Sequence, residues 1–154
     1  MEPTTGYPLY APANGLIKHI SDAPDPVFSN LLVGDGIYIL PKENKIYAPA
    51  DCNIAFIFPS RHALGLRTAN DVELLLHIGF DPKKLRNFVF RWYVEEDQEV
   101  KKGTLLAEFD SKNANQRSIS PPISLLVTNL SETQRIIYKE NRNVTLEDII
   151  LEIQ

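Results

Sequence analysis

The chain has 154 residues, and its 20 acidic and 16 basic residues give a formal net charge of −4. Because it lacks the basic surface that holds a phosphate backbone, we expect no nucleic-acid partner. The single cysteine, Cys52, excludes an internal disulfide and a cysteine-based zinc site, and it favours a reducing compartment.

The N-terminal segment carries no targeting or membrane signal. Residues 1–10 contain an acid and two prolines, whereas a secretory signal needs a basic start and an apolar run. The sequence also has no apolar stretch long enough to span a bilayer. We therefore expect a cytoplasmic protein with no direct membrane anchor. It would form a single domain at 1–154, with a short flexible tail at 1–6.

Short apolar alternations with a period of two predict strands around residues 37–39, at 54–58 and at 72–78. Turn-forming residues separate these segments at short intervals, which favours an all-β fold built as an antiparallel sandwich or barrel. A few short helical turns are expected near residues 26–31, 81–85 and 131–137, the last capped by Ser131. The polar stretch 110–122 is interpreted as a surface loop.

A weak internal repeat links two parts of the chain. Residues 10–14 read YAPAN and residues 47–51 read YAPAD, and an apolar alternation follows each of them. This similarity predicts two equivalent strand starts within one system of sheets.

The three histidines differ in their surroundings. In a strand at 72–79, the aliphatic residues at 72, 74, 76 and 78 take the core face, so His77 lies on the more open face. Gly79, two positions later, leaves room beside this imidazole. His62 follows a turn after the strand at 54–58, and neighbouring strands would bring His62 and His77 together. His19 has no such context.

Two neighbouring imidazoles suit phosphoryl transfer, because a neutral imidazole is a nucleophile near pH 7 and a second one can hydrogen-bond the phosphoryl oxygens. The same pair could bind zinc, although two ligands leave the site incomplete. Spacing alone favours a simpler interpretation, in which all three histidines are hydrogen-bonded or exposed without function. Asp81 would orient His77 or, more simply, cap the turn that begins at Pro82.

Several segments together resemble the glucose-type enzyme IIA of the bacterial phosphoenolpyruvate:sugar phosphotransferase system. The similarity extends from about residue 10 to residue 153. It is carried, in order, by Ala11-Pro12, Gly15 and Ile17, DAPDPVF at 22–28, VGDGI at 33–37, IYAPA at 46–50, IFPSRHA at 57–63, LLHIGFD at 75–81, VKKG at 100–103 and LLAEFD at 105–110.

This resemblance implies an antiparallel β-sandwich of the duplicated hybrid-motif type that relays phosphate. His77 would accept a phosphoryl group from the carrier HPr and pass it to the IIB domain of a sugar permease. His62 would support the phosphoryl group, and Ser60 would make a hydrogen bond in the site. The residues expected to meet partner proteins are Asp25, Val27, Phe28, Phe58, Leu75, Gly79 and Asp81.

No cofactor is required for this relay, although zinc could bridge His62 and His77 with a ligand supplied by a partner. We expect a monomer. One alternative is a regulatory module of the same fold that binds permeases or kinases according to its phosphorylation. A zinc hydrolase ranks last, because such enzymes need a His-x-His pair that this sequence lacks.

The sequence departs from the family pattern after the active-site motif. Asn87, Val89 and Asp97 stand where glycines are usual, Lys83 replaces an apolar residue, and Cys52 replaces a glycine. This segment is also unusually aromatic, with residues Phe88, Phe90, Trp92 and Tyr93. Core filling is the favoured role of these rings, whereas an exposed Trp92 or Phe88 would indicate an added surface.

Overall fold

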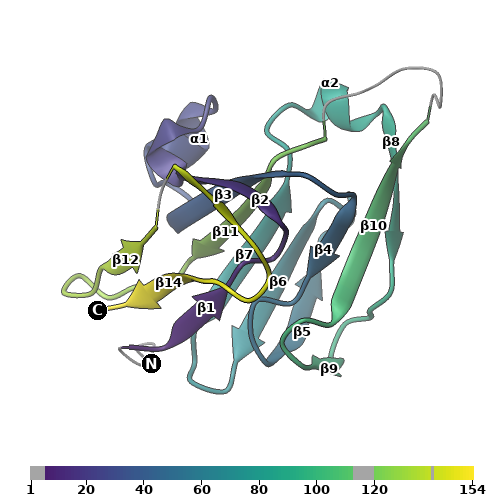
Figure 1. Cartoon of the computed structure of the whole chain (residues 1–154). Coiled ribbons are helices and arrows are strands. Elements are labelled where there is room, and N and C mark those ends of the chain that lie inside the picture. The colour runs from purple at the N-terminus through teal and green to yellow at the C-terminus, as the bar shows by residue number, and fades with distance from the viewer. Residues whose placement is uncertain (1–5, 113–119, 140) are drawn as a thin grey trace.

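The computed structural model describes residues 6–112, 120–139 and 141–154 (Figure 1). Within these ranges fourteen strands form three sheets, and every paired strand is antiparallel. The expected all-β fold is therefore confirmed. Residues 1–5 of the expected tail and residues 113–119 of the expected loop lie outside the described residues.

The largest sheet has eight strands; His77 lies in one of them, and His62 immediately precedes another. The short strands predicted around 37–39, 54–58 and 72–78 all belong to it. Its order is β13 (Arg142–Val144), β2 (Gly15–His19), β3 (Asp35–Pro41), β11 (Ile123–Val127), β7 (Glu73–Ile78), β6 (Ala63–Thr68), β5 (Cys52–Ile57) and β9 (Glu99–Val100).

Two three-stranded sheets complete the fold (Figure 1). One has the order β1 (Pro8–Tyr10), β14 (Ile149–Ile153) and β12 (Ile136–Tyr138), and the other has the order β4 (Lys45–Tyr47), β10 (Leu105–Ser111) and β8 (Phe88–Trp92). A single buried cluster contains Leu9 and Leu151 from the first, Ile46 and Phe109 from the second, and Leu76 from the large sheet. The core thus lies between the sheets, as in a sandwich.

The internal repeat is visible in the backbone hydrogen bonds. The N–H of Tyr10 donates to the carbonyl of Pro49 at 2.9 Å, and the N–H of Tyr47 donates to the carbonyl of Pro12 at 2.8 Å. Each segment leads from a strand of a small sheet, β1 or β4, into a strand of the large sheet, β2 or β5. The expected pair of equivalent strand starts is confirmed, and the two copies bond to each other.

Three short helical segments are present in the described ranges: η1 (Ile20–Asp22), α1 (Pro26–Ser29) and α2 (Pro82–Leu85). Helical turns expected near residues 26–31 and 81–85 are thereby confirmed. The helical turn expected at 131–137 is wrong, because Gln134 closes a turn onto the carbonyl of Ser131 and the chain then enters β12, which pairs with β14. No helix of the described residues has the length and apolar character needed to cross a membrane.

A second, smaller apolar cluster covers part of the other face of the large sheet. It consists of Ile20, Ala23, Phe28, Tyr38 and Leu126, with Val33, Leu75 and Phe80 packed against it. Leu126 and Tyr38 come from β11 and β3, and the remaining buried members come from η1 and the segment around α1. The cluster reaches β7, where Leu75 packs against it, so it borders one side of the sheet face on which His77 lies.

Candidate functional site

His77 is the penultimate residue of β7. Leu74, Leu76 and Ile78 of the same strand are almost completely buried, and His77 lies on the opposite, partly exposed face, as the alternation predicts. Its Nδ1 is 2.9 Å from the carbonyl oxygen of Gly79. Because a carbonyl can only accept a hydrogen bond, Nδ1 carries the proton and the neutral ring keeps its lone pair on Nε2.

Gly79 is held in a backbone conformation that fixes this carbonyl. Its φ is +75°, in the left-handed region that favours glycine. A Cβ at this position would lie 2.7 Å from Cδ2 of Leu85 in α2. The N–H of Gly79 also donates to the carbonyl of Pro122 at 2.7 Å. The carbonyl of Gly79, which selects the tautomer of His77, is therefore held in place by the surrounding backbone.

His62 lies immediately before β6, at the end of the turn that follows β5. Its carbonyl accepts the N–H of Ile78 at 2.8 Å, and its ring centroid is 5.7 Å from that of His77, with the two planes 80° apart. The expectation that neighbouring strands bring the two rings together is confirmed. Nδ1 of His62 lies 3.2 Å from the carbonyl of Ser60, so Ser60 contacts the histidine through its backbone.

The surroundings of His77 favour its neutral, nucleophilic form. Burial is the main influence and lowers the pKa of His77 below its ordinary value of 6.5, and the neighbouring His62 lowers it further. The carbonyl of Gly79 and the carboxylate of Asp25 act in the opposite direction but are outweighed. The ring of Phe28, 4.9 Å from the His77 ring between centroids, supplies part of this burial.

Asp25 and Asp81 both cap short helices near the site. Oδ1 of Asp25 accepts the N–H of Val27 at the start of α1, and Oδ1 of Asp81 accepts the N–H of Lys83 at the start of α2, each at 2.9 Å. The capping role favoured for Asp81 is confirmed. Both acids line one surface pocket, together with Phe80 and three other residues. They therefore flank the same hollow, and Asp25 is near enough to His77 to influence its pKa.

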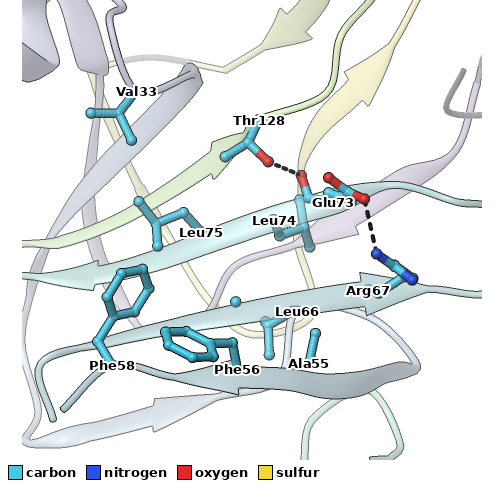
Figure 2. A pocket seen from close by; sticks show the side chains of 11 residues that line it. Val33, Ala55, Phe56, Phe58, Leu66, Arg67, Glu73, Leu74, Leu75 and Thr128 are labelled. Carbon is cyan, nitrogen blue, oxygen red and sulfur yellow. Dashed lines mark hydrogen bonds and ion pairs between the residues drawn. The ribbon is translucent and has the colours of Figure 1, made fainter.

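The apolar residues expected at a docking surface differ in exposure. Val27 and Phe58 are 48% and 37% exposed, whereas Phe28 is only 7% exposed and belongs to the smaller cluster. Leu75 is half-buried and lines a groove with Phe58 on the same face (Figure 2). An apolar surface thus lies beside the two histidines, and Phe28 is buried in the neighbouring smaller cluster, against which Leu75 packs.

The sequence prediction missed Phe56 as part of this groove. The alternation at 54–58 puts Phe56 on the same face as the buried Ile54, but the pairing of β5 with β6 shifts between these two residues, and Phe56 is 47% exposed. Its ring lies edge-on to that of Phe58, with centroids 5.0 Å apart (Figure 2). A bulge leaves no signal in an alternating pattern, so the sequence offers no means of finding it.

A metal site receives little support from the described residues. Within these residues no three His, Cys, Asp or Glu side chains gather in a way that could hold a metal ion. His62 and His77 would supply two ligands, and a tetrahedral zinc ion would need the others from elsewhere. His19 is engaged separately, with Nε2 at 3.0 Å from Asp35 and Nδ1 at 2.6 Å from Ser21.

The structure gives the surroundings of four residues in or near the segments that depart from the expected pattern, namely Phe88, Asp97, Cys52 and Trp92. Phe88 is 8% exposed and packs on Phe109, which confirms core filling for that ring. Asp97 has a φ of +66°, so the position where a glycine is usual does require a left-handed backbone. The thiol of Cys52 is buried, and this burial raises its pKa to about 12. Trp92 is half-buried, and its indole contacts the turn that carries His62.

Comparison with known proteins places these features in a family. A family model described as phosphoenolpyruvate-dependent sugar phosphotransferase system, EIIA 1, matches residues 7–133. The chain is 37% identical over 145 residues to a PTS system glucose-specific EIICBA component of Staphylococcus saprophyticus, and the match covers 94% of the chain and 21% of that protein. The chain thus spans about a fifth of that relative's length.

A solved structure agrees with this assignment. The glucose permease IIA of Mycoplasma capricolum superposes with a TM-score of 0.78 at 34% identity, covering 96% of each chain. With the family model matching most of its length, the chain belongs to the type 1 EIIA family of the phosphoenolpyruvate-dependent sugar phosphotransferase system.

Proposed function

We propose that Nε2 of His77 accepts a phosphoryl group from phosphorylated HPr and passes it to the IIB domain of a sugar permease in the cytoplasm. The observation that carries this proposal is the hydrogen bond from Nδ1 of His77 to Gly79, which leaves the lone pair on Nε2 while His62 lies beside the ring. In each step the bond from phosphorus to the donor atom breaks as the bond to the acceptor atom forms, and Nε2 of His77 is first the acceptor and then the donor. The proton on Nδ1 of His77 stays bonded to the carbonyl of Gly79 in both steps.

His62 is proposed to stabilise the phosphoryl group. When His62 is protonated on both nitrogens, Nδ1 still donates to the carbonyl of Ser60, and the Nε2–H can donate to a phosphoryl oxygen on His77. A charge-assisted hydrogen bond of this kind is stronger than a neutral one, more so where a bound partner excludes water. His62 would act in both transfer steps and matter most when the charged group leaves His77.

Partner proteins are proposed to dock on the exposed apolar side chains beside the histidines. Val27 and Phe58 are exposed, Leu75 is half-buried, and Asp25 and Asp81 lie at the rim. Covering these side chains would remove water from His77, and the acids would favour partners with basic docking faces. One surface used in turn by donor and acceptor accounts for a reversible relay.

Three matched variants test this proposal. His77→Gln should abolish labelling by phospho-HPr, and His62→Gln should retain labelling but lose onward transfer to a IIB domain. His19→Gln is the control, because His19 bonds to Asp35 and Ser21 rather than to the pair. Labelling of the His77→Gln protein at the normal rate, with the fold intact, would contradict the assignment of the acceptor.

A further inference from the structure

The turn that presents His62 has an unusual backbone. The N–H of Arg61 donates to the carbonyl of Phe58 at 2.8 Å, and the N–H of Phe58 donates to the carbonyl of Ala63 at 3.1 Å, which closes the turn between β5 and β6. Arg61 has a φ of +61°, a left-handed conformation that a residue with a Cβ adopts only when its surroundings support it. Something outside the turn must therefore help to hold Arg61.

Trp92 supplies that support from another sheet. It is the last residue of β8, and its indole Nε1–H donates to the carbonyl of Arg61 at 2.7 Å. The side chain of Glu96 adds a second link nearby by accepting the N–H of Ile57 at 3.0 Å. Trp92 belongs to β8 of a small sheet, and Arg61 lies in the turn between β5 and β6 of the large one, so the Trp92 bond ties the two sheets together beside His62.

The bond from Trp92 acts directly on His62, because the Arg61 carbonyl belongs to the peptide unit that joins Arg61 to His62. The carbonyl of His62 itself is held by the N–H of Ile78 at 2.8 Å. The backbone of His62 is thus fixed on both sides, by Trp92 before it and by β7 after it. With this backbone fixed, Nδ1 of His62 reaches the carbonyl of Ser60 and the ring lies against His77.

We propose that Trp92 is a positioning residue for phosphoryl transfer and that it acts by fixing the peptide unit that carries His62. This inference rests on the proposed function, in which His62 stabilises the phosphoryl group on His77. Trp92 itself touches neither imidazole ring in the contacts of the described residues. Its aromatic side chain packs against the main core, as the sequence favours, and it also supplies a hydrogen-bond donor to the turn that carries His62.

The test removes only this donor. Trp92 is the single tryptophan of the chain, so a tryptophan analogue introduced during expression replaces this residue alone. In β-(3-benzothienyl)alanine a sulfur atom replaces the indole N–H, so the size and shape of the ring are kept. The matched control is Tyr93→Phe, which removes a hydroxyl from the adjacent, half-exposed aromatic residue.

Two measurements separate the possible outcomes. Nitrogen NMR of the imidazoles should show that His62 loses its fixed tautomer in the analogue protein, whereas His77 keeps its own. Onward transfer to IIB should slow by about 3- to 10-fold, the change expected for one lost hydrogen bond, whereas acceptance from phospho-HPr changes by less than about 3-fold. The control should match the unmodified protein in both measurements.

Unchanged His62 signals in the folded analogue protein would overturn the role of Trp92, as would onward transfer at the normal rate. The NMR measurement needs no phosphoryl donor. A chain that accepts no phosphate would therefore refute the proposed function, while the NMR result would still decide whether Trp92 positions His62. Trp92→Phe, which lacks the donor but keeps an aromatic ring, gives an independent repeat of both measurements.

Discussion

Replacing Gly79 with alanine tests the claim that its backbone holds the tautomer of His77. Two costs add at this position. An L-residue at a φ of +75° destabilises the folded state by about 1–2 kcal/mol. A Cβ placed 2.7 Å from Cδ2 of Leu85 adds overpacking that costs about 1–3 kcal/mol more. The free energy of unfolding should therefore fall by about 2–5 kcal/mol. Relief of the clash would also move the carbonyl that accepts from His77.

Gly103 offers a matched control for this substitution. Its φ is +83°, but a Cβ there would meet nothing within 4 Å. Gly103→Ala should thus lower the free energy of unfolding only by the cost of the left-handed backbone, about 1–2 kcal/mol. Urea unfolding of both variants measures the difference, and nitrogen NMR reports whether Nδ1 of His77 still carries the proton. Equal destabilisation by the two variants, with the His77 tautomer unchanged in both, would refute the reasoning.

Three further predictions concern titration, reactivity and capping. Because burial lowers the pKa of His77, the unfolded state binds a proton that the folded state does not. The stability of the protein relative to His77→Gln should therefore fall as the pH drops through about 6.5, and a pH-independent difference in urea midpoints would contradict this. Cys52, with its pKa raised to about 12, should react with a thiol reagent at pH 8 far more slowly in the folded than in the unfolded protein, and equal rates would count against its burial. Asp81→Ala should lower the free energy of unfolding by about 0.5–2 kcal/mol, because it removes the helix cap, whereas Asp81→Asn should keep most of the stability. A similar loss of stability in both variants would mean that the capping hydrogen bond is not its cause.

Local pattern was sufficient to predict the central part of the site. The alternation at 72–78 put His77 on the open face because side chains in a strand alternate with a strict period of two. The two YAPA segments predicted the paired strand starts, and Asp81 before Pro82 predicted a capped turn. Each of these features depends on residues close together in the chain.

Features that depend on distant partners could not be predicted in this way. The segment at 131–137 is a turn and a strand because the C-terminal strand β14 is available to pair with it. Phe56 is exposed because of a bulge in the pairing of β5 with β6, and Trp92 of one sheet donates a hydrogen bond to Arg61 in a turn of another. In all three cases the deciding contact comes from a residue that local periodicity does not record.

The most direct test of the proposed relay is to determine which nitrogen of which histidine carries the phosphoryl group. Protein labelled with nitrogen-15 in its histidines would be incubated with phosphoenolpyruvate, enzyme I and HPr, and coupling between nitrogen and phosphorus would be recorded by NMR. We expect one phosphoryl group, on Nε2 of His77, with the proton on Nδ1 still bonded to Gly79. A phosphoryl group on Nδ1 of His77, or on His62 or His19, would contradict it, as would no phosphorylation of the folded protein by charged HPr.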